Sequence, residues 1–243
     1  MFKLKSPLGI LSIVCALSVL TVVSVLLLPE KKNSAENNLE NSIKENNILP
    51  AEAENQEGKL SEISDKDHLW GDLNNPVKMV IYSDFECPFC GRLADTVKKV
   101  MENYQGKVVI AFRHRPLAMH SSALSAAMAS ECAAEQGKFW EMHDMLFQDA
   151  KDKNLSADQF KKDAKGLGLA EEQFNTCLDS DKYKEKVESQ SAEGRAAGAE
   201  GTPTFFINNY IYPGAYPFED YTGNDGKQNA GVKTIIDKLL QNS

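Results

Sequence analysis

The stretch VKMVIYSDFECPFC (Val77–Cys90) joins a strand pattern to a pair of cysteines. Residues 77–83 are mostly β-branched or aromatic, which predicts a buried strand. Pro88 is a favoured first residue of a helix, and apolar side chains then recur at helical spacing from Cys90 to Tyr104. The stretch therefore predicts a strand, a short turn and a helix that begins with the Cys-Pro-Phe-Cys sequence.

Two cysteines at this spacing can bind a metal, form a passive disulfide or exchange electrons. A structural zinc site needs four ligands, usually from two paired motifs, and the chain has one such pair. The backbone N–H groups and the dipole at a helix start stabilise a thiolate, so Cys87 is expected to have a lowered pKa. We favour a redox pair in which Cys87 reacts with the substrate and Cys90 resolves the mixed disulfide, with the metal site and the passive disulfide as alternatives.

Downstream of the helix, the pattern predicts a second strand, a helical block, a hairpin and a final helix. The strand Lys107–Phe112 would lie parallel to the first, because a crossover helix joins them. Helical patterns follow at residues 121–136, 138–148, 156–168, 170–179 and 182–197. The hairpin strands are residues 204–207 and 210–212, joined at Asn208-Asn209, and the last helix covers residues 232–240.

Three motifs, in this order, resemble the DsbA-like branch of the thioredoxin superfamily. They are YSDFECPFC (Tyr82–Cys90), SECAAEQGKFWEMHDMLF (Ser130–Phe147) and GTPTFFIN (Gly201–Asn208). The resemblance covers about residues 70–243. It implies an α/β thioredoxin fold over residues 68–243, with an all-helical insertion at about 118–198 between the βαβ and ββα halves. It also implies an enzyme, a protein dithiol–disulfide oxidoreductase, that needs no cofactor and no metal.

The same resemblance assigns further site residues. Pro203 would be the cis proline that faces the cysteine pair, and the backbone at Thr202 would then pair with an extended substrate. The alternative for Pro203 is an ordinary proline at the start of a strand. Phe89 is a candidate for the substrate-binding surface, and Pro88 and Glu86 flank the catalytic pair.

The other polar residues near these motifs receive structural interpretations. Asp84 and Glu86 are read as solvated loop charges, although a carboxylate there could raise the pKa of Cys87 or relay a proton. His114 and His120 are expected at the surface or at a helix cap, and the alternative is a place near the active site. His143 is expected to be half-buried among aromatic neighbours.

Cys132 and Cys177 are the remaining cysteines of the domain. If Cys87 pairs with Cys90, these two can pair only with each other, and some relatives in the resembled family carry such a second disulfide. The alternative is two buried free thiols that pack as small apolar residues. We favour the disulfide, because the chain is expected in an oxidising compartment.

The amino-terminal third predicts that compartment. Residues 1–29 contain no charge after Lys5, which favours an uncleaved single-pass membrane helix over a cleaved signal peptide or a lipoprotein modified at Cys15. Residues 30–67 are polar, lack aromatic residues and predict a disordered tether. The catalytic domain would then lie outside the cytoplasm, on the periplasmic or cell-wall side of the cell membrane.

The expected function is oxidation of cysteine pairs in exported proteins. The net charge is −8, and no segment of the chain is strongly basic. We therefore predict no nucleic-acid partner. Ile81 stands where thioredoxin carries a buried acid, which weakly favours oxidation. The expected partners are reduced or unfolded exported proteins and, by resemblance, a quinone-linked membrane thiol oxidase. The alternatives are a disulfide isomerase or reductase, and a non-catalytic client-binding chaperone.

Overall fold

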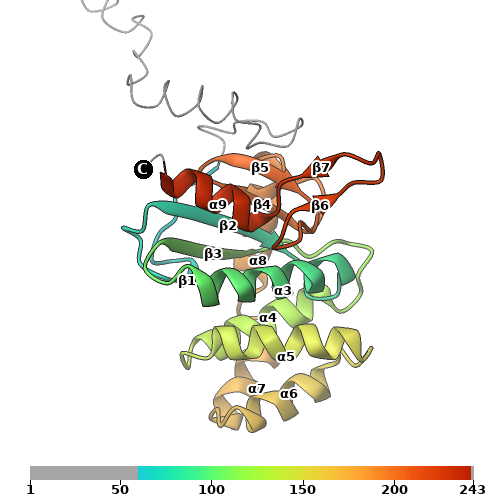
Figure 1. Cartoon of the computed structure of the whole chain (residues 1–243). Helices are drawn as coiled ribbons and strands as arrows, with labels where there is room; N and C mark the ends of the chain where they lie inside the picture. The colour runs from blue at the N-terminus through green and yellow to red at the C-terminus, as the bar shows by residue number, and fades with distance from the viewer. Residues whose placement is uncertain (1–59, 242–243) are drawn as a thin grey trace, which may run out of the picture. The chain divides into compact units, whose positions relative to one another are not determined.

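A five-stranded sheet forms the centre of residues 60–241, the part of the chain that the computed structural model describes (Figure 1). In spatial order its strands are β1 (His68–Trp70), β3 (Val108–His114), β2 (Val77–Ser83), β4 (Thr204–Ile207) and β5 (Tyr210–Pro213). Strands β2 and β3 are parallel, and the other neighbouring pairs are antiparallel. The predicted βαβ unit and the later ββα unit therefore share one sheet.

Helix α3 (Pro88–Asn103) is the crossover between the two parallel strands. Cys87 is its N-cap residue, with extended backbone dihedrals, and Pro88 occupies the first turn as predicted. The helix buries Leu93, Val97 and Val100 on one face. Because the strand end and the helix start are separated by only a short turn, the cysteine pair is fixed at the carboxyl edge of the sheet.

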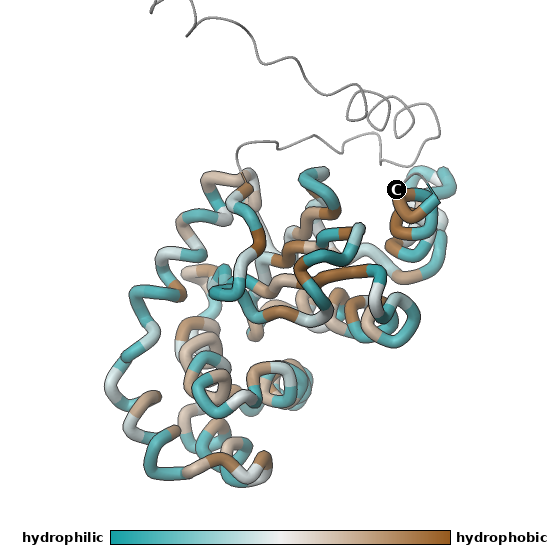
Figure 2. Tube along the Cα trace, turned by 90° about the vertical axis from the view of Figure 1, so that its left-hand side faces the viewer, coloured by the Kyte–Doolittle hydropathy of each residue, from teal (hydrophilic) through white to brown (hydrophobic). Residues whose placement is uncertain are grey.

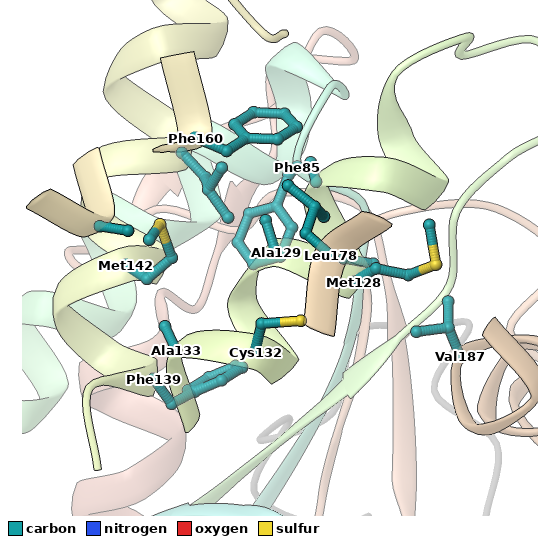
Figure 3. Packing of buried hydrophobic residues seen from close by; sticks show 14 of the residues in the cluster. Phe85, Met128, Ala129, Cys132, Ala133, Phe139, Met142, Phe160, Leu178 and Val187 are labelled. Carbon is teal, nitrogen blue, oxygen red and sulfur yellow. The ribbon is translucent and has the colours of Figure 1, made fainter. Parts of the chain in front are cut away.

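The helical insertion contains five helices. They are α4 (Ala123–Ala134), α5 (Phe139–Lys151), α6 (Ala157–Gly166), α7 (Glu171–Asp179) and α8 (Lys184–Ala196). The side chain of Ser156 caps α6 by accepting a hydrogen bond from the Gln159 N–H at 3.3 Å, as its sequence predicts. Buried aromatic and aliphatic side chains of the insertion pack together with Phe85 from the turn before the cysteines (Figure 3). The insertion and the turn that carries Cys87 therefore share one hydrophobic core.

Helices cover both faces of the sheet. In Figure 1, α3 and α9 (Val232–Gln241) lie on the near face and α8 lies behind. Gly194 of α8 brings its backbone close to Tyr82 of β2, since a Cβ on Gly194 would lie 2.5 Å from a carbon of the Tyr82 ring. Hydrophobic and hydrophilic residues alternate along the helices (Figure 2), as expected for elements with one buried face.

Two short pairings were not predicted, whereas the predicted hairpin is present. Asn208 and Asn209 have φ values of 46° and 72°, the left-handed conformations that a tight hairpin turn needs. Strand β1 adds to the edge of β3, and β6 (Tyr221–Thr222) pairs with β7 (Gln228–Asn229). These strands have only two or three residues, which is too short for a periodic pattern.

The amino-terminal boundary of the folded domain lies earlier than predicted. The Arg113 guanidinium donates to Asp67 at 2.7 Å and to the Ser61 hydroxyl at 2.9 Å. The assignment of residues up to 67 to a tether is therefore wrong for 61–67, because these contacts tie them to β3. The predicted anchor at 1–29 and the rest of the tether lie outside the described residues. Between residues 60 and 241, no helix is long and apolar enough to cross a membrane.

Candidate active site

The turn that carries Cys87 and Cys90 faces a loop that is distant in sequence. The Cys87 thiol donates a hydrogen bond to the Thr202 carbonyl oxygen at 3.3 Å, and the peptide bond between Thr202 and Pro203 is cis. The turn before α3 and the segment before β4 therefore meet at one edge of the sheet. This arrangement brings together Cys87, Thr202 and Pro203, as their assignment to one site requires.

The environment of Cys87 favours a thiolate. A hydrogen bond from the Cys90 thiol is the largest influence that lowers the pKa of Cys87, from an ordinary value of 9.0 to about 6. The backbone N–H groups of Cys90 and Phe89 and the side chain of Thr202 act in the same direction, whereas burial opposes them. The Thr202 hydroxyl is buried, and none of the described residues is a hydrogen-bond partner for it. The groups from Phe89 and Cys90 belong to the start of α3, where an anion is stabilised.

Cys90 is the more shielded sulfur. Cys87 is 4% exposed and Cys90 is 1% exposed. The difference is small, but Cys87 is the more accessible of the two, as expected. Burial raises the pKa of Cys90 far above its ordinary value, and the neighbouring Cys87 raises it further. The Asp84 N–H donates to Cys90 Sγ at 3.4 Å. The pair thus consists of one thiol that ionises easily and one that stays protonated.

Asp84 is a buried hub, so its interpretation as a solvated loop charge is wrong. Its carboxylate accepts three hydrogen bonds, from the Glu86 N–H at 2.8 Å, the Leu117 N–H at 2.8 Å and His120 Nδ1 at 2.7 Å. Its carbonyl oxygen also accepts from the Cys87 N–H at 3.2 Å. Asp84 therefore fixes the turn that carries Cys87 and holds the loop after β3 against it.

Glu86 also has a defined partner. Its carboxylate accepts the backbone N–H of Ser122 at 2.6 Å, at the start of α4. The interpretation of Glu86 as a solvated charge is wrong for the same reason as for Asp84, because the loop before α4 folds over this edge of the sheet. Phe89, by contrast, is 52% exposed, with the Arg92 guanidinium 4.2 Å from its ring centroid. Phe89 and Pro88 are therefore the exposed residues of the Cys-Pro-Phe-Cys turn.

His114 is fully buried, which contradicts the surface role expected for it. Its Nε2 lies 3.0 Å from Glu131 Oε1, and His68 Nε2 lies 2.9 Å from the same oxygen. These three residues form the one cluster with metal-ligand geometry found among residues 60–241. Lys186 already binds the second carboxylate oxygen at 2.7 Å, and His114 Nδ1 has no partner to orient a metal-bound ring. The Glu131 carboxylate is thus already shared by two imidazole rings and the ammonium group of Lys186.

His143 and the second cysteine pair lie in the core of the insertion. The His143 ring packs against Phe85, Phe112 and Phe147, with centroid separations of 5.7, 5.3 and 4.9 Å. It is more deeply buried than expected, because the turn before the cysteines contributes Phe85 to the same cluster. Cys132 of α4 and Cys177 of α7 form a disulfide bond that closes a loop of 45 residues.

Sequence reasoning did not predict the burial of Asp84, its hydrogen bond with His120 or the cluster around Glu131. One signal was available, since Asp84 and His114 each stand at the carboxyl end of one of two adjacent parallel strands. Functional groups of open α/β sheets gather at that edge. The partners from Leu117, His120 and Glu131 come from later segments, and no local pattern marks them.

Comparisons with known proteins agree with this geometry. The family model described as thioredoxin matches residues 63–224. The Na(+)/H(+) antiporter NhaA 3 of Salinispora tropica is 38% identical over 165 residues, which cover 64% of this chain and 24% of the antiporter. The chain therefore spans about a quarter of the length of the curated relatives that it matches.

Solved structures share the fold at low sequence identity. Oxidised BdbD from Bacillus subtilis aligns with a TM-score of 0.61 and 22% identity, covering 75% of this chain and 97% of BdbD. The thiol-disulfide exchange protein alpha-DsbA2 from Wolbachia pipientis aligns with a TM-score of 0.59 and 18% identity, covering 88% of this chain and all of the other. At these identities, the likeness establishes the DsbA-like fold.

Proposed function

Because the chain belongs to the thioredoxin family, with the DsbA-like fold and the cysteine pair of a thiol–disulfide oxidoreductase, we propose that it oxidises cysteine pairs in exported proteins. Cys87 and Cys90 are the catalytic residues of this proposal. The observation that carries it is the contrast between them, since Cys87 is held as a thiolate with a pKa of about 6 while burial keeps Cys90 protonated.

The reaction begins with the Cys87–Cys90 disulfide. A client thiolate attacks Cys87 Sγ, a mixed disulfide forms, and Cys90 leaves and takes up a proton. A second client thiolate then attacks the client sulfur of the mixed disulfide, and Cys87 leaves as a thiolate. The client loses two electrons and two protons and gains a disulfide. The enzyme takes up both electrons and ends with a Cys87 thiolate and a Cys90 thiol, so one proton goes to Cys90 and the other to solvent. A leaving thiol of low pKa speeds the last step.

The direction of electron flow follows from the same contrast. Stabilising the Cys87 thiolate stabilises the reduced enzyme, so its disulfide becomes a stronger oxidant. Ile81 is buried on β2 and offers no proton acceptor near the pair. Both features favour the oxidase over the isomerase or reductase, which remains the alternative together with a chaperone that binds clients without turnover.

The client would bind as an extended segment. The backbone of Thr202, next to the cis Pro203, lies beside Cys87 and is placed to pair with a client strand. Phe89, in the same turn as Cys87, offers an exposed apolar side chain. Such a surface recognises unfolded backbone and an apolar side chain, so it suits many clients.

The proposed location is the outer side of the cell membrane. Residues 1–29 would anchor the chain, and the polar segment that follows would let the catalytic domain reach its clients. The Cys132–Cys177 disulfide supports an oxidising compartment. A quinone-linked membrane thiol oxidase would reoxidise the pair. Antiporter activity is not proposed, since the match covers about a quarter of those relatives.

Trapping with Cys90→Ser in cells tests this function. Without the resolving cysteine, clients stay linked to Cys87, and we expect exported proteins with paired cysteines among them. Cys87→Ser serves as the matched control and should trap nothing. If Cys87→Ser retains full activity in a refolding assay with a reduced client, the chaperone alternative replaces the oxidase.

A further inference from the structure

His120 is joined to the catalytic turn through a single buried residue. Its Nδ1 donates to Asp84 Oδ2 at 2.7 Å, and the Asp84 side chain is completely buried. Asp84 in turn accepts the Cys87 N–H and donates its own N–H to Cys90 Sγ. A change at His120 can therefore reach both sulfurs through Asp84.

The hydrogen bond between His120 and Asp84 matters for Cys87 because carboxylates lie close to the thiol. Asp84 receives three N–H donors on its two oxygens and donates nothing from its side chain, which is the pattern of an ionised carboxylate. Glu86 lies in the same turn. Two carboxylates beside Cys87 would disfavour its thiolate, because like charges raise the pKa of an acid. A cation close to this turn would offset the two carboxylates and favour the thiolate further.

His120 is the group placed to supply that cation. Its side chain is 17% exposed, and it lines a surface hollow together with Glu188 and Arg195 of α8, so its ring exchanges protons with solvent. Partial burial lowers the pKa of His120, but the hydrogen bond and charge of Asp84, with the charges of Cys87 and Glu86, outweigh it and raise the pKa above its ordinary value.

We propose that His120 is a positioning residue that sets the oxidising strength of the cysteine pair, because its imidazolium balances the buried Asp84 carboxylate beside the Cys87 thiolate. This role presupposes the thiol–disulfide exchange proposed for Cys87. The imidazolium is present below the pKa of His120 and is lost above it. The Asp84 charge is then uncompensated, the thiolate is less favoured, and the disulfide becomes a weaker oxidant.

Two substitutions at one position separate charge from hydrogen bonding. His120→Gln keeps an N–H donor for Asp84 but removes the charge, whereas His120→Lys keeps both. We expect His120→Gln to raise the pKa of Cys87 by about one unit and to lower the equilibrium constant for glutathione oxidation about tenfold, or roughly 30 mV. His120→Lys should retain the wild-type values. The double variant Asp84→Asn/His120→Gln removes both charges and should also return the Cys87 pKa toward the wild-type value.

The readouts are thiolate absorbance against pH and equilibrium with glutathione. Lys161→Gln is a matched control, because it removes the cation of an exposed ion pair, which Lys161 of α6 forms with Asp179 of α7. The inference is overturned if His120→Gln behaves as wild type, or if His120→Lys shifts as much as His120→Gln. Failure of the wild-type protein itself to exchange with glutathione would instead contradict the proposed function.

The inference can also be tested on the wild-type protein alone. Binding linkage is reciprocal, so a thiolate that is stabilised by the imidazolium must also stabilise the imidazolium. The His120 ring, followed by NMR against pH, should titrate at a higher pH in the reduced protein than in the oxidised protein. Equal titration midpoints in the two redox states would overturn the inference.

Discussion

At the scale of single residues, the site depends on polar groups that are buried where the chain folds over itself. Cys87, Cys90 and Pro203 could be predicted from sequence, since a helix start and a motif mark them. Asp84 and His114 were expected to be solvated, because each looks like a loop or strand-end residue in its own segment. Their burial follows from segments that arrive later in the chain and cover the carboxyl edge of the sheet.

The reactivity of the first cysteine gives a prediction at this scale. Cys87 should be alkylated by iodoacetamide with a pH profile whose midpoint lies near 6, because the thiolate is the nucleophile. The lowered pKa also stabilises the reduced fold. This contribution is fully present above the ordinary thiol pKa of about 9 and is lost as the pH falls to about 6. A midpoint near 9 in the alkylation profile would show that the helix start does not activate Cys87.

At the scale of elements, short-range patterns predicted the strands and helices that carry the site. Strands β2 and β4 and the start of α3 lie where the sequence places them. β1 and the β6–β7 pair escaped prediction, because three or fewer residues carry no periodic signal and only the neighbouring strand defines them. The packing of α8 on the sheet also depends on the close approach of Gly194 to Tyr82. No sequence pattern predicts this contact.

That approach predicts the effect of adding one methyl group. Gly194→Ala should destabilise the protein by about 1–3 kcal/mol, the usual cost of overpacking a core, since the new Cβ would lie 2.5 Å from the Tyr82 ring. Gly166→Ala in α6 is the matched control. Its Cβ would meet nothing within 4 Å, so it should stabilise by roughly 0.5–1 kcal/mol. Urea unfolding measures both, and equal effects of the two variants would contradict the packing described.

At the scale of the whole molecule, the insertion and the sheet share a core, but each carries its own cysteine pair, and in this structure Cys87 and Cys90 are free thiols. The Cys132–Cys177 bond joins α4 to α7, whereas the catalytic pair lies at the edge of the sheet. The DsbA-like arrangement was expected from the order of the three motifs. The early start of the folded domain was not, because the contacts of Ser61 and Asp67 with Arg113 join segments about fifty residues apart.

The second disulfide should contribute stability and leave the chemistry unchanged. Closing a loop of 45 residues stabilises by about 4 kcal/mol in the chain-entropy model. The variant Cys132→Ala/Cys177→Ala should therefore lose about this amount in urea unfolding, while it keeps the reduction potential of the catalytic pair. A variant with wild-type stability would show that the bond does not constrain the unfolded chain, and a changed potential would show that the two disulfides are coupled.

The central claim is that the Cys87–Cys90 disulfide is an oxidant. Equilibration of the purified domain with glutathione buffers, followed by alkylation and mass measurement of both cysteines, gives its reduction potential. The low pKa of Cys87 predicts a potential less negative than about −200 mV, toward the value of about −120 mV known for DsbA. A potential near that of thioredoxin, about −270 mV, would contradict the oxidase and leave a reductase in its place.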